Sequence, residues 1–364
     1  MTYEEIYEKL KSELPSDVYA ENAEFLRKEG MKYGEAGNFD GVRAAGKLMG
    51  ELMPPEQMDE IQRLTHIDGV RLDDFYGRIV QLVQEKNFVD AKPLAEQLYN
   101  KIIDGFSEGE NALFLSLRNP FEDNLCQHLF PTRKTINRAP FDFGTYLTTY
   151  AFIMIECGST LGAIPILEKA IEFNPVDVGP KFELAEVYKL IKNKKKLIEI
   201  TQQTLKVASS PDALARCYAN MGYMCTDFGE IDDAVCFYSA SVMLAPHPAI
   251  PYELKGLAQM KGAPLEQPTF EKVKETLDRY DIEFGPDKQV IDVAAALASH
   301  YLLEHDVPNA LKALKLLYNL TRDEKIKGII LRYEPNAQEV TSNARQVSEG
   351  RPNITRTVNE NPEE

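Results

Sequence analysis

Three cysteines that lie close together in the sequence are this chain's first candidates for a chemical role. Cys217, Cys225 and Cys236 fall in one stretch of the sequence. Thiolates bind zinc or exchange disulfides when a second cysteine or a histidine follows at short spacing, as in CxxC. No such partner stands at that spacing, and Cys217 lies on the same helix face as Cys225. Because a buried free cysteine behaves as a small apolar side chain, we predict a packing role for both.

A second candidate is the stretch GVRAAGK at residues 41–47, which matches most of a phosphate-binding loop. Such a loop ends in a Ser or Thr that holds magnesium, and it follows a strand that presents backbone amides to the phosphates. Leu48 stands at the magnesium position, and the stretch falls on a predicted helix. We therefore expect no nucleotide there.

The histidines are scattered along the chain. His300 and His305 are close in sequence, but their spacing points them to different faces of a helix, unlike the i, i+4 pair of a metalloprotease. No two carboxylates can be singled out by spacing as an acid–base couple. The sequence thus predicts no catalytic residue, no cofactor and no metal, and a protein that is not an enzyme.

The charge balance bears on the kind of partner. The chain has 41 basic and 57 acidic residues, a formal net charge of −16, and 44% apolar residues. Excess negative charge repels a phosphate backbone, so we expect no nucleic acid and a protein or peptide partner that is basic or apolar rather than acidic. No apolar run is long enough for a membrane helix, and the first residues lack a signal sequence. With cysteine usage typical of reduced thiols, this predicts a cytoplasmic protein that makes no membrane contact; homo-oligomerisation stays open.

The elements around the cysteines repeat. Around Cys217 and Cys225, Tyr218 and Gly222 are followed by Ala234, Tyr238 and Pro246. Small residues at Gly222 and Ala234 let two helices approach closely, Tyr238 fills the space between units, and Pro246 ends the second helix. We interpret this pattern as a helical hairpin.

The same landmarks recur upstream, at Ala151, Gly158, Ala163, Ala170 and Pro175. Weaker copies run through residues 30–54, 75–98, 178–196 and 297–317. In these landmarks the chain resembles the tetratricopeptide-repeat family over about residues 23–330, most strongly between Gly144 and Pro246. With RNPFEDNLCQHLF before the repeat, it is also similar to uncharacterised bacterial proteins of this type. The resemblance implies an all-α protein, an α-solenoid of helical hairpins that forms a right-handed superhelix.

The pattern divides the chain into four parts. We expect divergent helical repeats over 1–104, a helical insertion over 105–143, the repeat array over 144–333, and a mobile polar tail over 334–364. The insertion is too apolar for a linker, and the tail lacks the apolar spacing needed to bury a face.

The resemblance also implies a binding surface, because in this family the first helix of each pair lines a concave groove. The groove positions that match in this chain are Thr145, Thr148, Thr149, Phe152, Glu156, Phe182, Glu183, Glu186, Arg216, Asn220, Tyr223 and Asp227. Asn220 matches the asparagine with which some chaperone-binding members hold a peptide backbone. The other positions of their carboxylate clamp hold Thr149, Glu183 and Leu254, so we do not expect capture of an acidic peptide C-terminus.

The leading hypothesis is therefore a non-enzymatic scaffold that binds a protein or peptide in this groove. One alternative is a regulatory protein that senses a peptide. Another places an enzyme, or a phosphate or nucleic-acid site, in the insertion, where aromatic and basic residues alternate. These residues are Phe114, Phe121, Phe130, Phe141, Phe143, Arg118, Arg133, Lys134 and Arg138.

Overall fold

The computed structural model describes residues 2–335, and helices make up most of this part of the chain. The chain forms two compact units, Met1–Asp74 and Phe75–Glu364. The boundary between these units falls between Asp74 and Phe75. The predicted tail lies outside the described residues from position 336 onward. Across residues 2–335, no helix combines the length and the apolar character that a membrane crossing requires.

The first unit has an all-helical core followed by a small hairpin. It contains α1 (Tyr3–Ser12), α2 (Tyr19–Glu35), α3 (Phe39–Glu51), α4 (Pro55–Thr65), β1 (His66–Ile67), β2 (Val70–Arg71) and the start of α5 (Leu72–Gln84). The first two helices pack on α3, where Ile6, Leu26 and Leu48 form part of the buried core. Residues 41–47 lie inside α3, so their backbone amides belong to a helix and Leu48 is a packing residue.

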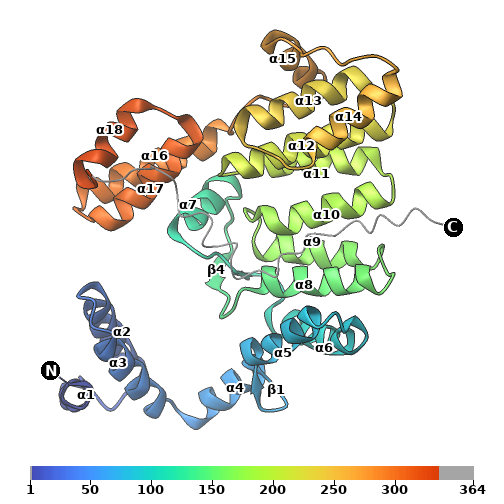
Figure 1. The fold of residues 1–364 in the computed structure, drawn as a ribbon. Coiled ribbons are helices and arrows are strands. Elements are labelled where there is room, and N and C mark those ends of the chain that lie inside the picture. The colour runs from blue at the N-terminus through green and yellow to red at the C-terminus, as the bar shows by residue number, and fades with distance from the viewer. Residues whose placement is uncertain (1, 336–364) are drawn as a thin grey trace. The chain divides into compact units, whose positions relative to one another are not determined.

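The second unit is built mainly of helices that follow one another in pairs (Figure 1). Its elements after α5 are α6 (Phe88–Phe106), β3 (Ala112–Leu115), α7 (Pro120–Leu129), β4 (Thr135–Arg138), α8 (Phe143–Glu156), α9 (Ala163–Phe173), α10 (Val178–Leu190), α11 (Lys194–Leu205), α12 (Pro211–Asp227), α13 (Ile231–Leu244), α14 (Ile250–Lys261), α15 (Phe270–Arg279), α16 (Lys288–Leu303), α17 (Val307–Thr321) and α18 (Glu324–Tyr333).

Helices α8 to α13 form three stacked pairs. α8 packs on α9, α10 on α11 and α12 on α13, while α9 contacts α10 and α11 contacts α12. Gly158 and Gly229 have positive φ values of 80° and 75°, a conformation that glycine adopts without steric cost, in the turns inside the first and third pairs. Side-chain oxygens of Asp142, Asp177 and Ser210 accept backbone N–H bonds and begin α8, α10 and α12.

The cysteines of the third pair are buried, as the repeat pattern predicted. Cys217 and Cys225 on α12 and Cys236 on α13 are at most 2% exposed. Burial raises the pKa of Cys217 and of Cys225, which keeps both thiols protonated at neutral pH. Cys225 also donates a hydrogen bond from Sγ to Tyr280 Oη at 3.6 Å, a contact that the sequence did not indicate.

The insertion is not wholly helical, and this corrects the sequence-based expectation. β3 and β4 pair in parallel, with Ala112 opposite Thr135 and Leu115 opposite Arg138, and α7 connects them. Directly after β3, the backbone N–H of Ser116 donates a hydrogen bond to the carbonyl oxygen of Phe173, the last residue of α9 (2.7 Å). Each strand has only four residues, so period-2 alternation is too short to be recognised, and the pairing depends on contacts that are distant in sequence.

Candidate functional site

The first helices of successive pairs lie side by side, since α12 contacts both α10 and α14 (Figure 1). Seven side chains from α10 and α12 interact there, and we call this set the first-helix surface. It consists of Phe182, Glu183, Glu186, Lys189, Arg216, Asn220 and Tyr223. On α12 these positions are four and three residues apart, which brings them to one face; on α10, Phe182, Glu186 and Lys189 are spaced in the same way, and Glu183 stands next to Phe182.

Lys189 connects the two helices at the centre of this surface. Its Nζ atom donates to Glu186 Oε1 at 2.9 Å and to Asn220 Oδ1 at 2.7 Å, and it lies 5.1 Å from the centre of the Tyr223 ring. Burial lowers the pKa of Lys189, while the Glu186 carboxylate acts in the opposite direction. The ammonium group is thus oriented by an amide, a carboxylate and an aromatic face, and the ring of Tyr223 remains 39% exposed.

Arg216 connects the same helices a turn away. Its guanidinium carbon lies 4.4 Å from the centre of the Phe182 ring, and Nη2 lies 3.6 Å from Glu186 Oε1 and 3.9 Å from Glu183 Oε1. Glu186 therefore interacts with both cations of the surface. Glu183 and Glu186 lie beside Arg216, yet their side chains stay 23% and 39% exposed. The ring of Tyr223 is exposed as well.

His247, in the segment between α13 and α14, extends the surface. Its Nδ1 atom is buried and has no hydrogen-bond partner within the described residues. Burial lowers the pKa of His247, and the nearby charges of Arg216 and Lys189 act in the same direction, opposed by Glu253. The imidazole is consequently neutral at neutral pH, and one of its nitrogens is unused, which costs free energy unless a ligand or water satisfies it.

The structure brings together six of the twelve residues that sequence predicted for the groove. These are Phe182, Glu183, Glu186, Arg216, Asn220 and Tyr223. Asp227 lies at the C-terminal end of α12, where its carboxylate is 3.3 Å from Lys192 Nζ. Sequence reasoning missed Lys189 and His247; Lys189 follows Glu186 by three residues, so helical spacing alone could have identified it.

The predicted groove residues of α8 have other roles. Thr149 is buried, and its hydroxyl lies 2.9 Å from Tyr76 Oη of α5, while Phe152 packs edge-to-face on Phe88 of α6. Helices α5 and α6 therefore cover this part of α8, and the sequence could not show that packing.

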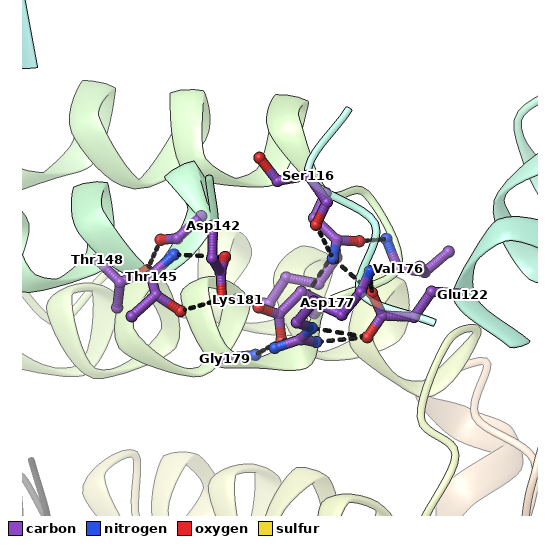
Figure 2. Close-up of polar contacts among 12 residues, drawn as sticks. Ser116, Glu122, Asp142, Thr145, Thr148, Val176, Asp177, Gly179 and Lys181 are labelled. Atoms are coloured by element: carbon purple, nitrogen blue, oxygen red, sulfur yellow. Dashed lines mark hydrogen bonds and ion pairs between the residues drawn. The ribbon is translucent and has the colours of Figure 1, made fainter. Parts of the chain in front are cut away.

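The remaining polar residues of α8 bond locally. Thr145 donates to Asp142 Oδ2 at 2.7 Å and Thr148 to Gly144 O at 2.7 Å, near the start of the helix (Figure 2). Of the five predicted groove residues on α8, only Glu156 is exposed.

A second group of polar side chains joins the insertion to the helix pairs, and we call it the junction cluster. It consists of Ser116, Arg118, Glu122, Asn174, Asp177 and Lys181. Arg118 Nη2 lies 2.6 Å from Glu122 Oε1 and 3.2 Å from Asp177 Oδ1, and Figure 2 shows Glu122 and Asp177 facing each other across this site. Asn174 Nδ2 donates to Glu122 Oε2 at 2.9 Å and to Ser116 O at 3.2 Å.

The junction cluster contains perturbed groups, as an enzyme in the insertion would require, but its polar atoms are engaged with one another. Burial lowers the pKa of Lys181 to about 8, and its Nζ donates to Pro175 O at 2.6 Å and Asp177 O at 3.1 Å. Burial also raises the pKa of nearby Cys126 to about 11, which disfavours a thiolate. Over residues 2–335, no group of three or more His, Cys, Asp or Glu side chains is arranged to hold a metal ion.

The aromatic and basic residues of the insertion are also largely engaged internally. Lys134 pairs with Glu108 at 2.5 Å and Arg138 with Asp123 at 2.7 Å. The Phe143 ring lies against Phe106, Phe141, Tyr146 and Phe173. These contacts fit a packed module better than a row of stacking platforms for nucleic acid.

Comparison with known proteins does not assign the chain to a family. No protein-family model matches the chain, and no curated protein sequence matches it.

Proposed function

We propose that this chain is a tetratricopeptide-like repeat protein that binds a peptide segment of another protein along the first-helix surface and catalyses no reaction. The observation that carries the proposal is the network around Lys189, which orients Glu186, Asn220 and Tyr223 on adjacent helices. In helical-repeat proteins such first helices form the surface that partners contact.

The chemistry of this surface favours a peptide with an aromatic or aliphatic anchor and a basic group. Tyr223 and, on α14, Tyr252 are exposed rings that can pack on an apolar side chain. Glu183 and Glu186 are partly exposed carboxylates, and the net charge of −16 attracts a basic segment. All five cysteines are free, and Cys157 is exposed, which supports a working place in a reducing, cytoplasmic environment.

The test uses a displayed library of random peptides selected on the full-length protein, followed by titration of the selected peptides against variants. Tyr223→Ala should weaken binding about tenfold or more, because truncation of an aromatic anchor costs ~2 kcal/mol. Tyr333→Ala on α18 removes a ring of similar exposure, 47%, and should leave affinity unchanged. Equal affinities for both variants would contradict the proposal.

A second pair of variants tests the carboxylates. Glu183→Gln with Glu186→Gln keeps the side-chain shapes and removes the charges, whereas charge reversal would place new cations beside Arg216 and Lys189. We expect the double variant to bind basic peptides less tightly. Because Glu186 also pairs with the buried Lys189 ammonium, the melting temperature of the variant should fall as well, so binding is measured at a temperature at which both proteins are folded. If binding instead survives and is lost on combined Ala substitution of Arg133, Lys134 and Arg138, the insertion is the working surface.

A further inference from the structure

A cavity of about 180 Å³ lies between the insertion and the helix pairs, away from the first-helix surface. Its walls come from α6, β3, α7, β4 and α9. Four of its lining residues are buried apolar side chains, Phe106, Leu115, Cys126 and Phe173. The cavity is therefore a space with an apolar interior that two parts of the chain form together.

Two further apolar residues of the lining are partly exposed. Phe130 and Ile136 are 46% and 39% exposed, so they present uncovered apolar surface to solvent. Water in such a space finds few hydrogen-bonding partners, and an apolar group that displaces it gains free energy. An engineered apolar cavity of similar size, about 150 Å³, binds benzene, which indicates the size of molecule that fits.

The charged residues at the rim are already paired. Lys169 Nζ lies 2.5 Å from Glu172, and Glu108 accepts from Lys134 Nζ at 2.5 Å. Each ammonium group faces a carboxylate, so the rim offers neither a spare cation to an acid nor a spare carboxylate to an amine. A charged ligand would lose hydration without gaining a counterion.

We propose that this cavity binds a small uncharged apolar molecule about the size of one fused aromatic ring system. Such a ligand touches β3 and α7 on one side and α6 and α9 on the other. It binds only when the insertion is docked, so its binding stabilises the folded chain by mass action. The insertion thus has a role separate from peptide binding, as the lid and wall of a small-molecule site.

The experiment titrates the full-length protein with indole, followed by calorimetry and thermal denaturation. We expect saturable binding at one site and a melting temperature that rises with indole concentration. Indole-3-carboxylate, which is charged at neutral pH, should bind at least ~10-fold more weakly. Absence of saturable indole binding, or equal affinity for the carboxylate, would overturn the proposal.

Two further measurements locate the site. Ile103→Phe fills the cavity from its wall and should abolish indole binding, whereas Leu161→Phe, at an exposed position outside the cavity, should not. Leu115 lines the cavity, so bound indole should shift its methyl NMR signals and leave those of the exposed Leu161, outside the cavity, unchanged. Indole binding without a shift at Leu115 would place the ligand elsewhere, whether or not Ile103→Phe folds.

Discussion

Ring carbons Cδ1 and Cε1 of Tyr238 lie 2.7 Å from the position that a Cβ atom would take at Gly222. This contact joins α13 to α12 in the third helix pair, and the Tyr238 side chain is almost completely buried there. A ring can approach a helix backbone this closely only where no side chain intervenes. Gly222 is thus required by packing, whereas its effect on helix propensity alone would be unfavourable.

We predict that Gly222→Ala destabilises the protein by about 1–3 kcal/mol, because the new methyl group displaces the Tyr238 ring. Gly256→Ala is the control: it lies in the interior of α14, and no atom stands within 4 Å of the added Cβ. This second variant should gain about 0.5–1 kcal/mol from helix propensity. Denaturant unfolding of both variants measures the difference, and a stabilised Gly222→Ala would contradict the packing geometry.

The junction cluster should contribute strongly to stability through Arg118. Arg118→Ala leaves the buried carboxylates of Glu122 and Asp177 without their cation, a change that costs about 3–5 kcal/mol for buried pairs. Arg138→Ala breaks an exposed pair with Asp123 in the same insertion and should cost less than ~1 kcal/mol. Free energies of unfolding from urea titrations test this, and equal losses for the two arginines would rule out the anchoring role.

The two cysteines of α12 should differ in their tolerance of serine. Cys217 is completely buried, so Cys217→Ser places a hydroxyl in the core at a cost of about 1–3 kcal/mol. Cys225→Ser should cost less, because Tyr280 Oη stands where the new hydroxyl can bond to it. Melting curves of both variants give the order, and a larger loss at position 225 would show that the Tyr280 contact does not compensate.

His247 should make stability depend on pH. Its pKa in the folded protein lies below the ordinary value of 6.5, mainly because of burial, so the unfolded chain binds this proton more readily. The neutral imidazole of His247 makes its full contribution to the free energy of unfolding above about pH 6.5. This contribution is lost as the pH falls from that value toward the lower pKa of the folded state. We expect His247→Gln to flatten the fall in unfolding free energy between about pH 6.5 and 5 relative to the wild type. An unchanged slope would mean that the imidazole takes up its proton at the same pH in the folded and unfolded states.

The sequence by itself determined the helices of the second unit and several of their contacts. Gly222, Ala234 and Tyr238 could be identified as packing residues because close approach of two helices demands small residues beside large ones at regular spacing. The tetratricopeptide resemblance, rather than periodicity, implied that Glu186, Arg216 and Asn220 belong to one surface. A helix brings residues three, four or seven positions apart to one face whatever surrounds it, and a short turn sets the next helix beside it, so Gly222 and Tyr238 can be paired from local sequence.

Only the tertiary structure decided the features that join distant segments. The pairing of β3 with β4, the cover that Tyr76 and Phe88 place over α8, and the ion pair of Arg118 with Asp177 all connect residues far apart in sequence. The cavity beside Cys126 likewise depends on five elements. Many alternative partners satisfy the same local pattern of apolar and charged residues, and the choice among them is made by packing and by burial of paired charges. The sequence therefore predicted the helical units, and the folded chain determined which of their faces remain open.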